Sequence, residues 1–238
     1  MSPAFELEIV VPAFNEAARL SGTLHHLVSF LERQPWSSRL IVVDNGSADE
    51  TATIARAVES PSVLITVIGC ARPGKGAAVR RGMLAGTAPY VGFVDADLST
   101  PISTLTETLR HLDAGAAAVI ASRHAPGARF AQPQPFGRRL GGSAFRALTR
   151  PLVAGVHDTQ CGFKFFRRAQ LQKALHRCHL DGFAFDVELL RHIRAGGGQI
   201  VEIPVTWQDD RRSTFQPLRD GTATFAALFT LYRRAVAL

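Results

Sequence analysis

Two carboxylates stand two residues apart where an apolar run of the chain ends. Asp95 and Asp97 lie at the end of a predicted strand, Tyr90 to Asp95, and just before Ser99 and Thr100. A hard cation such as Mg²⁺ or Mn²⁺ prefers oxygen ligands at about 2.0–2.2 Å and bridges a carboxylate to substrate phosphates. The spacing therefore favours Asp97 as a metal ligand and Asp95 as a contact to the nucleotide. The structural alternative is an acidic loop that caps the following helix.

A second acid ends the predicted strand from Leu40 to Asp44. The carboxylate of Asp44 can accept an N–H group of a nucleotide base, and the turn at Gly46 and Ser47 lets the backbone approach a ligand closely. The alternative is an ordinary turn followed by a helix that Asp49 caps.

Two further loops carry groups that suit a nucleotide diphosphate. Lys75, flanked by Gly74 and Gly76, begins a predicted helix, where a cation joins the free N–H groups and the positive end of the helix dipole. The spacing is not that of the Walker phosphate loop. The strand predicted from Leu7 to Pro12 is followed by residues that contact a nucleoside or merely cap a helix. The nucleotide-binding candidates of these loops, with the residue between the two acids, are Pro12, Ala13, Asn15, Glu16, Gly74, Lys75 and Ala96.

A sheet is needed to bring these loops together. From residue 5 to 122 the chain alternates short apolar runs with helix-like stretches, which is typical of parallel βαβ units. The other predicted strands are Val63 to Ile68 and Ala117 to Ser122, and the predicted helices are Ala17 to Arg33, Asp49 to Glu59, Lys75 to Ala85 and Pro101 to Ala114. Ligands of open parallel sheets sit beyond the carboxyl ends of the strands, so we expect the polar loops to share one site.

The pattern changes after residue 122. A loop rich in Pro, Gly and Arg is predicted from Arg123 to Arg139, and it is followed by a helix from Gly141 to Val153, a strand from Phe163 to Phe166, a helix from Phe185 to Ala195 and a strand from Gln199 to Trp207. We expect one domain over residues 1–220, with a nucleotide-binding half (1–122) and an acceptor half (123–220). An amphipathic helix is predicted over residues 221–238.

Charge is distributed unevenly between the two halves. Residues 1–122 hold 9 Lys and Arg against 12 Asp and Glu, net −3, and residues 123–238 hold 18 against 8, net +10. A positive field attracts phosphorylated substrates or anionic lipid, and the acidic first half argues against nucleic acid. The candidates for contact with an acceptor or its phosphate are Arg123, Arg129, Gln160, Lys164, Arg211 and Arg212, and for the charged ones the alternative is a solvated surface.

The need for a catalytic base depends on the acceptor. A phosphate monoester, with a second pKa of about 6, is already ionised at neutral pH, whereas an alcohol must lose a proton. If a base is required, the candidates are Asp158 and Asp186, although Asp186 could equally cap the helix that follows it.

Features of a secreted or membrane-spanning protein are lacking. Three cysteines show neither a disulfide framework nor a zinc pattern, and the start of the chain has no basic segment followed by an apolar run. We therefore expect a cytoplasmic protein. The C-terminal helix either lies peripherally on the inner face of the membrane, with arginines toward anionic headgroups, or packs on the domain or on a dimer partner. The sequence leaves these alternatives open.

Several of these motifs, in this order, resemble family 2 glycosyltransferases of the GT-A fold, an α/β fold with a Rossmann-like, mostly parallel sheet flanked by helices. The matching stretches are residues 12–16, 44–47, 74–76 and 95–97. Residues 158–164, 185–188 and 202–207 resemble the branch of dolichyl-phosphate β-glucosyltransferases and bacterial polyprenyl-phosphate glycosyltransferases.

The resemblance implies inverting transfer from a UDP-sugar, or sometimes GDP-mannose, with a divalent metal on the diphosphate. It implies that Asp44 binds uracil, that Asp97 binds the metal and that Asp95 faces the nucleotide. Asn45 departs from the family, since many relatives have a second aspartate there. Ser99 stands where mannosyl-transferring relatives often have glutamine, which favours a glucose-type or GlcNAc-type donor. The membrane-spanning helices of several bacterial relatives are missing.

The leading hypothesis is transfer of a hexose from a UDP-sugar to a polyprenyl or dolichyl phosphate. One alternative is a soluble glycosyltransferase that acts on a hydroxyl of a small metabolite. Another is a noncatalytic nucleotide-binding module, which would keep Asp44 and the Gly-Lys-Gly loop but would need neither Asp97 nor the arginines.

Overall fold

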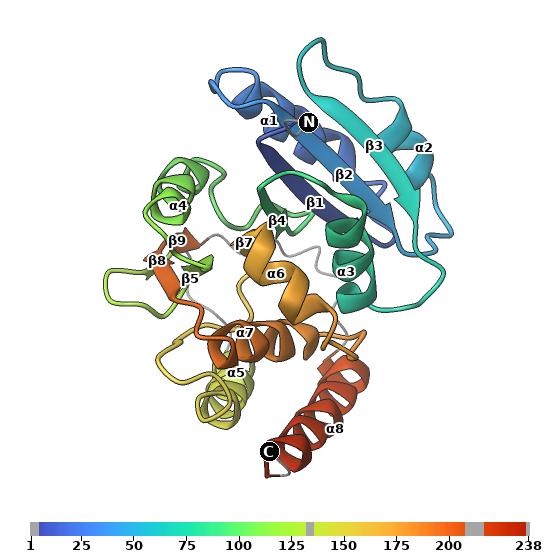
Figure 1. Cartoon of the computed structure of the whole chain (residues 1–238). Coiled ribbons are helices and arrows are strands. Elements are labelled where there is room, and N and C mark those ends of the chain that lie inside the picture. Colours follow the sequence, from blue (N-terminus) through green and yellow to red (C-terminus); the bar gives the residue numbers. More distant parts are fainter. Residues whose placement is uncertain (1–4, 132–135, 208–216, 237–238) are drawn as a thin grey trace.

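The computed structural model describes residues 5–131, 136–207 and 217–236, and its centre is one seven-stranded sheet with the order β3-β2-β1-β4-β7-β5-β8 (Figure 1). Val- and Ile-rich runs form its strands because β-branched side chains pack well on a pleated surface that is covered on both faces. Five strands come from the first half of the chain, each within two residues of its predicted bounds: β1 (Leu7–Ala13), β2 (Ser38–Asp44), β3 (Leu64–Gly69), β4 (Tyr90–Val94) and β5 (Ala118–Ser122).

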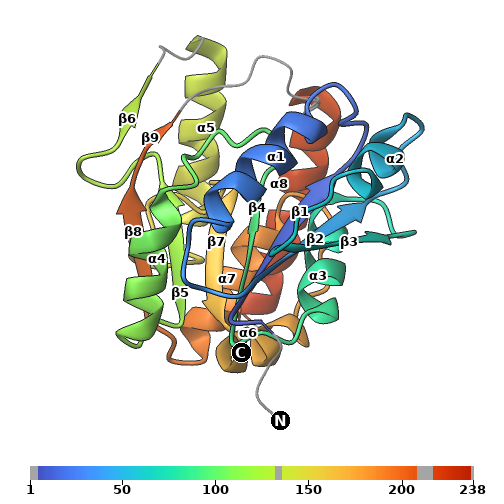
Figure 2. The same ribbon diagram turned by 90° about the horizontal axis from the view of Figure 1, so that it is seen from above.

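Two strands from the second half complete the sheet. β7 (Phe163–Arg167) inserts between β4 and β5 and runs antiparallel to both, and β8 (Ile200–Pro204) pairs parallel with β5. The sheet is mostly parallel, as predicted, with one reversed strand that joins the two halves of the chain. β6 (Arg129–Phe130) and β9 (Thr206–Trp207) form a separate two-stranded ribbon next to β8 (Figure 2).

Helices cover both faces of this sheet (Figure 2). Leu7, Ile9 and Val11 of β1 point into one core, whereas Val10 points into the other, because successive side chains of a strand face opposite sides. The first core also contains side chains of α1 (Leu20–Leu31), α2 (Thr51–Arg56) and α4 (Thr104–Asp113). The second contains side chains of α3 (Lys75–Ala85), α6 (Arg168–Leu175), α7 (Phe185–Ala195) and α8 (Pro217–Val236).

The second half departs from its predicted elements in three places. The loop expected from Arg123 to Arg139 contains β6 and the start of α5 (Phe136–Thr149), whose Gly and Arg content resembles a loop. The short helix α6 was not predicted, because only three of its residues are buried and it follows β7 directly. The strand expected from Gln199 to Trp207 is divided into β8 and β9, because Pro204 has no N–H group to continue the ladder.

Helix boundaries also shift. Pro101 was expected in the first turn of a helix, but α4 begins only at Thr104. The Pro101 carbonyl instead accepts a turn hydrogen bond from the Thr104 N–H at 3.1 Å. The C-terminal helix α8 begins at Pro217, four residues before its predicted start.

The C-terminal helix packs on the domain. Leu228 and Leu231 are buried in the second core, and the Arg191 guanidinium donates a 3.2 Å hydrogen bond to the Leu231 carbonyl. The other side of α8 leaves Phe225 and Phe229 exposed. Within residues 5–131, 136–207 and 217–236, no helix combines the length and apolar character required to cross a bilayer.

Candidate functional site

The loops after β1 and β2 are tied together at the carboxyl edge of the sheet. Ala13 and Asp44 are register partners at the ends of these strands. The Asn15 N–H donates to the Ser47 hydroxyl at 2.9 Å, and the Asn15 side-chain oxygen accepts the Ala48 N–H at 2.9 Å. Asn15 has a φ of 54°, a left-handed conformation that asparagine tolerates. Two loops that are 30 residues apart in sequence therefore form one surface beside Asp44.

Asn45 anchors the lysine loop to this surface. Its amide nitrogen donates to the carbonyls of Cys70 and Arg72, at 3.2 and 2.7 Å, and its amide oxygen accepts the Gly74 N–H at 2.8 Å. A carboxylate has no donor for the two carbonyls. This explains the asparagine at a position where many family members have aspartate, and sequence reasoning had given Asn45 no role.

Lys75 bridges the lysine loop to the acidic loop. Its ammonium lies 2.7 Å from an Asp95 oxygen, and both side chains are partly exposed. Burial opposes the charge of this lysine, but the negative charges of Asp95, Asp186 and Asp97 outweigh burial and raise the Lys75 pKa to about 12. A permanent cation thus stands at the start of α3, where a phosphate group is favoured.

The acidic loop holds Asp97 in a strained turn. Leu98 has a φ of 46°, which costs free energy for a branched side chain, and this turn lets the Ser99 N–H donate to the Asp97 carboxylate at 3.0 Å. Burial and the neighbouring charge of Asp95 raise the pKa of Asp97 above its usual range. The pKa of Glu16 is raised as well, mainly by burial and also by these two acids. Negative charge accumulates here beyond what Lys75 compensates.

Gly162 allows the second half of the chain to approach Asp95. The Asp95 N–H donates to the Gly162 carbonyl at 2.9 Å, and a Cβ atom on Gly162 would lie 1.9 Å from an Asp95 oxygen. Only glycine fits this contact, which lies directly before β7.

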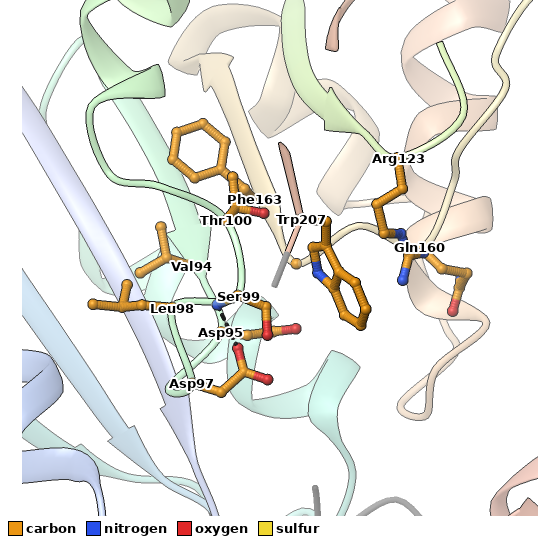
Figure 3. A pocket seen from close by; sticks show the side chains of 11 residues that line it. Val94, Asp95, Asp97, Leu98, Ser99, Thr100, Arg123, Gln160, Phe163 and Trp207 are labelled. Carbon is orange, nitrogen blue, oxygen red and sulfur yellow. Dashed lines mark hydrogen bonds between the residues drawn. The ribbon is translucent and has the colours of Figure 1, made fainter. Parts of the chain in front are cut away.

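A pocket opens beside the two acids, between the two halves of the chain (Figure 3). Figure 3 shows the side chain of Trp207 between Asp95, Asp97 and Ser99 on one side and Arg123 and Gln160 on the other. The residues that line the pocket are Val94, Asp95, Asp97, Leu98, Ser99, Thr100, Arg123, Gln160, Gly162, Phe163 and Trp207.

The buried Asp158 and the partly exposed Arg123 form an ion pair at the wall of this pocket. The guanidinium donates two hydrogen bonds to the carboxylate, at 2.7 and 2.9 Å, and the Arg123 N–H donates a third at 3.0 Å. Burial favours the neutral acid, but the charge and hydrogen bonds of Arg123 outweigh it and hold the pKa of Asp158 well below its usual range. Asp158, predicted as a possible base, and Arg123, predicted as an acceptor contact, are therefore paired with each other.

Lys164 and Asp186 form a second buried pair. The Lys164 side chain is fully buried, lies 3.1 Å from an Asp186 oxygen and also donates to the Cys161 carbonyl at 2.5 Å. Asp186, on α7, is buried too and does not line the pocket. Lys164, predicted to contact an acceptor, is thus buried beside Asp186, and neither Asp158 nor Asp186 is among the residues that line this pocket.

The other candidates for acceptor contact lie in different surroundings. Gln160 lines the pocket, whereas Arg129 is exposed on β6 and is not among the lining residues. Arg211 and Arg212 lie outside the described residues. Trp207, which sequence reasoning quoted within a motif without a role, lines the pocket. An aromatic side chain at the end of the last predicted strand was the available signal.

The residues present fit a divalent cation that is shared with a substrate. No cluster of three or more His, Cys, Asp or Glu side chains in the described ranges could hold a metal alone. Mg²⁺, however, is commonly held by one or two carboxylates together with substrate phosphates. Asp97 borders the pocket and carries uncompensated negative charge, so it can supply the protein ligand while a diphosphate supplies the rest.

Comparisons with known proteins agree with this geometry. Residues 8–175 match the model of glycosyl transferase family 2. The chain is 33% identical over 212 residues to a dolichyl-phosphate β-glucosyltransferase of Trichomonas vaginalis, covering 84% of this chain and 63% of that protein. It is 32% identical over 233 residues to the human dolichyl-phosphate β-glucosyltransferase, covering 91% of this chain and 71% of that protein.

Solved structures show the same fold. A structure of glucosyl-3-phosphoglycerate synthase from Mycobacterium tuberculosis in complex with UDP superposes with a TM-score of 0.71, at 22% identity, covering 96% of this chain and 80% of that chain. A second structure of that enzyme contains Mn²⁺, UDP and glucosyl-3-phosphoglycerate, with a TM-score of 0.68 at 21% identity, covering 96% of this chain and 79% of that chain. The predicted α/β class and GT-A fold are confirmed.

Proposed function

Because the chain belongs to glycosyl transferase family 2, we propose that it transfers a hexose, of glucose or GlcNAc type, from a UDP-sugar to a polyprenyl or dolichyl phosphate with inversion at the sugar. The observation that carries the proposal is the meeting of Asp44, Lys75, Asp95 and Asp97 at one sheet edge, beside a pocket between the two halves. A base-binding acid, a phosphate-binding cation and a metal-binding acid are the groups that a nucleotide diphosphate requires.

The donor side follows from the order of these groups along the edge. Asp44 ends β2, Lys75 reaches Asp95 at the end of β4, and Asp97 borders the pocket. Uracil would therefore bind at Asp44, and the nucleoside would be surrounded by Asn15, Glu16, Gly46 and Ser47. The diphosphate would then lie near Lys75 and Asp97. A bound Mg²⁺ or Mn²⁺ would neutralise charge on the leaving diphosphate. Asp97 would hold that cation.

The phosphate acceptor is supported by chemistry and by the names of the relatives. Asp158 and Asp186 are each paired with a cation, Arg123 and Lys164, and neither acid lines the pocket. A phosphate acceptor needs none, since it is already ionised at neutral pH. The names of the similar Trichomonas and human proteins specify dolichyl phosphate. A hydroxyl of a small metabolite remains the alternative acceptor.

A polyprenyl acceptor resides in a membrane, so we also propose a peripheral contact of this protein with the bilayer. Phe225 and Phe229 on α8 and Leu148 on α5 are exposed, and so are Arg233 on α8 and Arg150, directly after α5. Apolar side chains beside arginines suit an interface with anionic headgroups.

Calorimetry with UDP tests the donor site. Mn²⁺ should strengthen binding of UDP to the wild-type protein, and Asp97→Asn should remove that gain and lower hexose transfer by about 100-fold or more. Glu107→Gln, which changes an exposed acid on α4, serves as the matched control. Equal UDP affinity in Mn²⁺ and in EDTA would contradict the assignment of Asp97.

Transfer assays then identify the acceptor. Radiolabelled UDP-glucose and UDP-GlcNAc are each offered with a polyprenyl phosphate, the matching polyprenol, or a small phosphorylated hydroxy acid. We expect product with the polyprenyl phosphate alone. Product only with the small acceptor would replace the lipid by a metabolite.

A further inference from the structure

Trp207 presents an aromatic surface to a pocket that is otherwise strongly polar on one side. The residue ends β9, is half-buried and lines the pocket together with Asp95 and Asp97. Figure 3 shows its indole between these two acids and Arg123. A large apolar group is thus held beside the carboxylates instead of being withdrawn into the core.

Contacts on the protein side fix the indole in place. The Arg123 guanidinium carbon lies 5.4 Å from the indole centroid, within cation–π range, and the Phe130 ring packs against the indole edge-on at 5.9 Å. Arg123 is itself held by Asp158 at 2.7 Å. The Trp207 side chain is therefore already ordered in the folded protein. A ligand that stacks on it loses less binding free energy to the ordering of side chains.

The remaining lining defines the kind of ligand that would fit. The Gln160 amide and the Ser99 hydroxyl border the same pocket, so hydrogen-bonding groups surround the aromatic surface. A pyranose ring has the complementary chemistry: its C–H groups form an apolar face, and hydroxyls project from its rim. The negative face of an indole attracts such C–H groups.

We propose that Trp207 is the stacking surface for the hexosyl group of the nucleotide-sugar donor. The inference rests on the proposed function, because the hexosyl group is bonded to the diphosphate that Lys75 and Asp97 would hold. Asp97 and Trp207 line the same pocket, so a sugar attached to that diphosphate enters the space in front of the indole. The role of Arg123 is then to position Trp207 and not to bind the acceptor.

Fluorescence isolates this contact, since the chain contains two tryptophans. Trp36 does not line the pocket, so Trp36→Phe leaves Trp207 as the single fluorophore without changing the pocket lining. In that variant, with Mn²⁺ present, UDP-glucose should shield Trp207 from acrylamide quenching, whereas UDP should not. Equal shielding by both ligands, or none by UDP-glucose, would overturn the proposal.

Calorimetry on Trp207→Ala and Trp207→Phe completes the test. We expect UDP to bind Trp207→Ala as it binds the wild-type protein, and UDP-glucose to bind about tenfold more weakly, the size of one lost stacking contact. Trp207→Phe should recover most of that loss, and Trp36→Phe should show none. A Trp207→Ala variant that loses only acceptor affinity would overturn the inference.

The donor site and the role of Trp207 can be tested separately. If UDP does not bind the wild-type protein at all, the proposed donor site and this inference both fall. If UDP binds with Mn²⁺ and Trp207→Ala binds UDP-glucose normally, only the assignment of Trp207 falls.

Discussion

At the scale of single residues, the pair of Asp158 and Arg123 shows how one side chain can serve the site without touching a substrate. Asp158 accepts three hydrogen bonds from Arg123 and a fourth from the Gln160 N–H at 3.1 Å. Both Arg123 and Gln160 line the pocket. The buried acid therefore fixes two pocket residues from behind.

Asp158→Asn should lower the free energy of unfolding by about 1–3 kcal/mol at pH 7, because it leaves the largely buried Arg123 guanidinium without its counter-charge. The pKa of Asp158 is depressed in the folded state and is about 3.9 when the chain is unfolded. The stabilisation is thus complete well above pH 4 and declines as pH falls below that value.

Urea unfolding at pH 7 and at about pH 3.5 measures this effect. The difference between the wild-type protein and Asp158→Asn should shrink at the lower pH, and Glu107→Gln should show no comparable change. A difference that is equally large at both pH values would contradict the ion-pair explanation.

At the scale of elements, the contact of α3 with the start of α7 sets the position of Lys75. Gly76 is buried, and a Cβ atom there would lie 2.3 Å from the Phe185 Cβ and 2.8 Å from the Gly182 carbonyl oxygen. Backbone and a core aromatic thus close on the first turn of α3, and the lysine beside it has little freedom to shift.

Gly76→Ala should lower the free energy of unfolding by about 1–3 kcal/mol, the cost of overpacking, and should weaken UDP binding because the helix start moves. Gly22→Ala is the matched control, since its Cβ would meet nothing within 4 Å inside α1. That control should gain about 0.5–1 kcal/mol from the better helix propensity of alanine. Urea unfolding and calorimetry check both variants, and an unchanged Gly76→Ala would refute the tight contact.

The elements of the first half could be predicted from sequence because each carries a strong local signal. Apolar runs of five to seven residues mark β1, β2 and β4, and the bounds of α3 are as predicted. The elements of the second half depend on distant partners. α6 has few buried residues, and β6 and β9 are two-residue strands that exist only because they pair with each other.

The residues of the candidate site likewise fall into those with a local sequence signal and those that depend on distant partners. Asp44, Lys75, Asp95 and Asp97 could be nominated because strand ends are local features that meet at one sheet edge. Two ion pairs could not be predicted, namely Arg123 with Asp158 and Lys164 with Asp186. The sequence does not distinguish a charged residue that is solvated from one that is paired inside the protein. The contact of Gly162 with Asp95 arises from β7, 67 residues further along.

At the scale of the whole molecule, the proposed membrane contact depends on apolar side chains that the domain leaves uncovered. Phe229→Ser should reduce cosedimentation with vesicles of phosphatidylcholine and phosphatidylserine by about tenfold, because one buried aromatic contributes roughly 1.5–3 kcal/mol. Leu84→Ser, on α3, is the control, since Leu84 is 51% exposed and Phe229 is 66% exposed. Equal binding of both variants and the wild-type protein would remove the support for this face.

The reversed strand β7 also constrains how the protein can assemble during its synthesis. β5 pairs only with β7 and β8 in the main sheet, and both are made after it, so a nascent chain that ends at residue 122 has β4 with one open edge and β5 with two. The pocket cannot form until residue 167 has left the ribosome and β7 has inserted between β4 and β5. Nucleotide binding and the completion of folding should therefore arise together, and a fragment of the first 122 residues should be prone to aggregate through its unpaired edges.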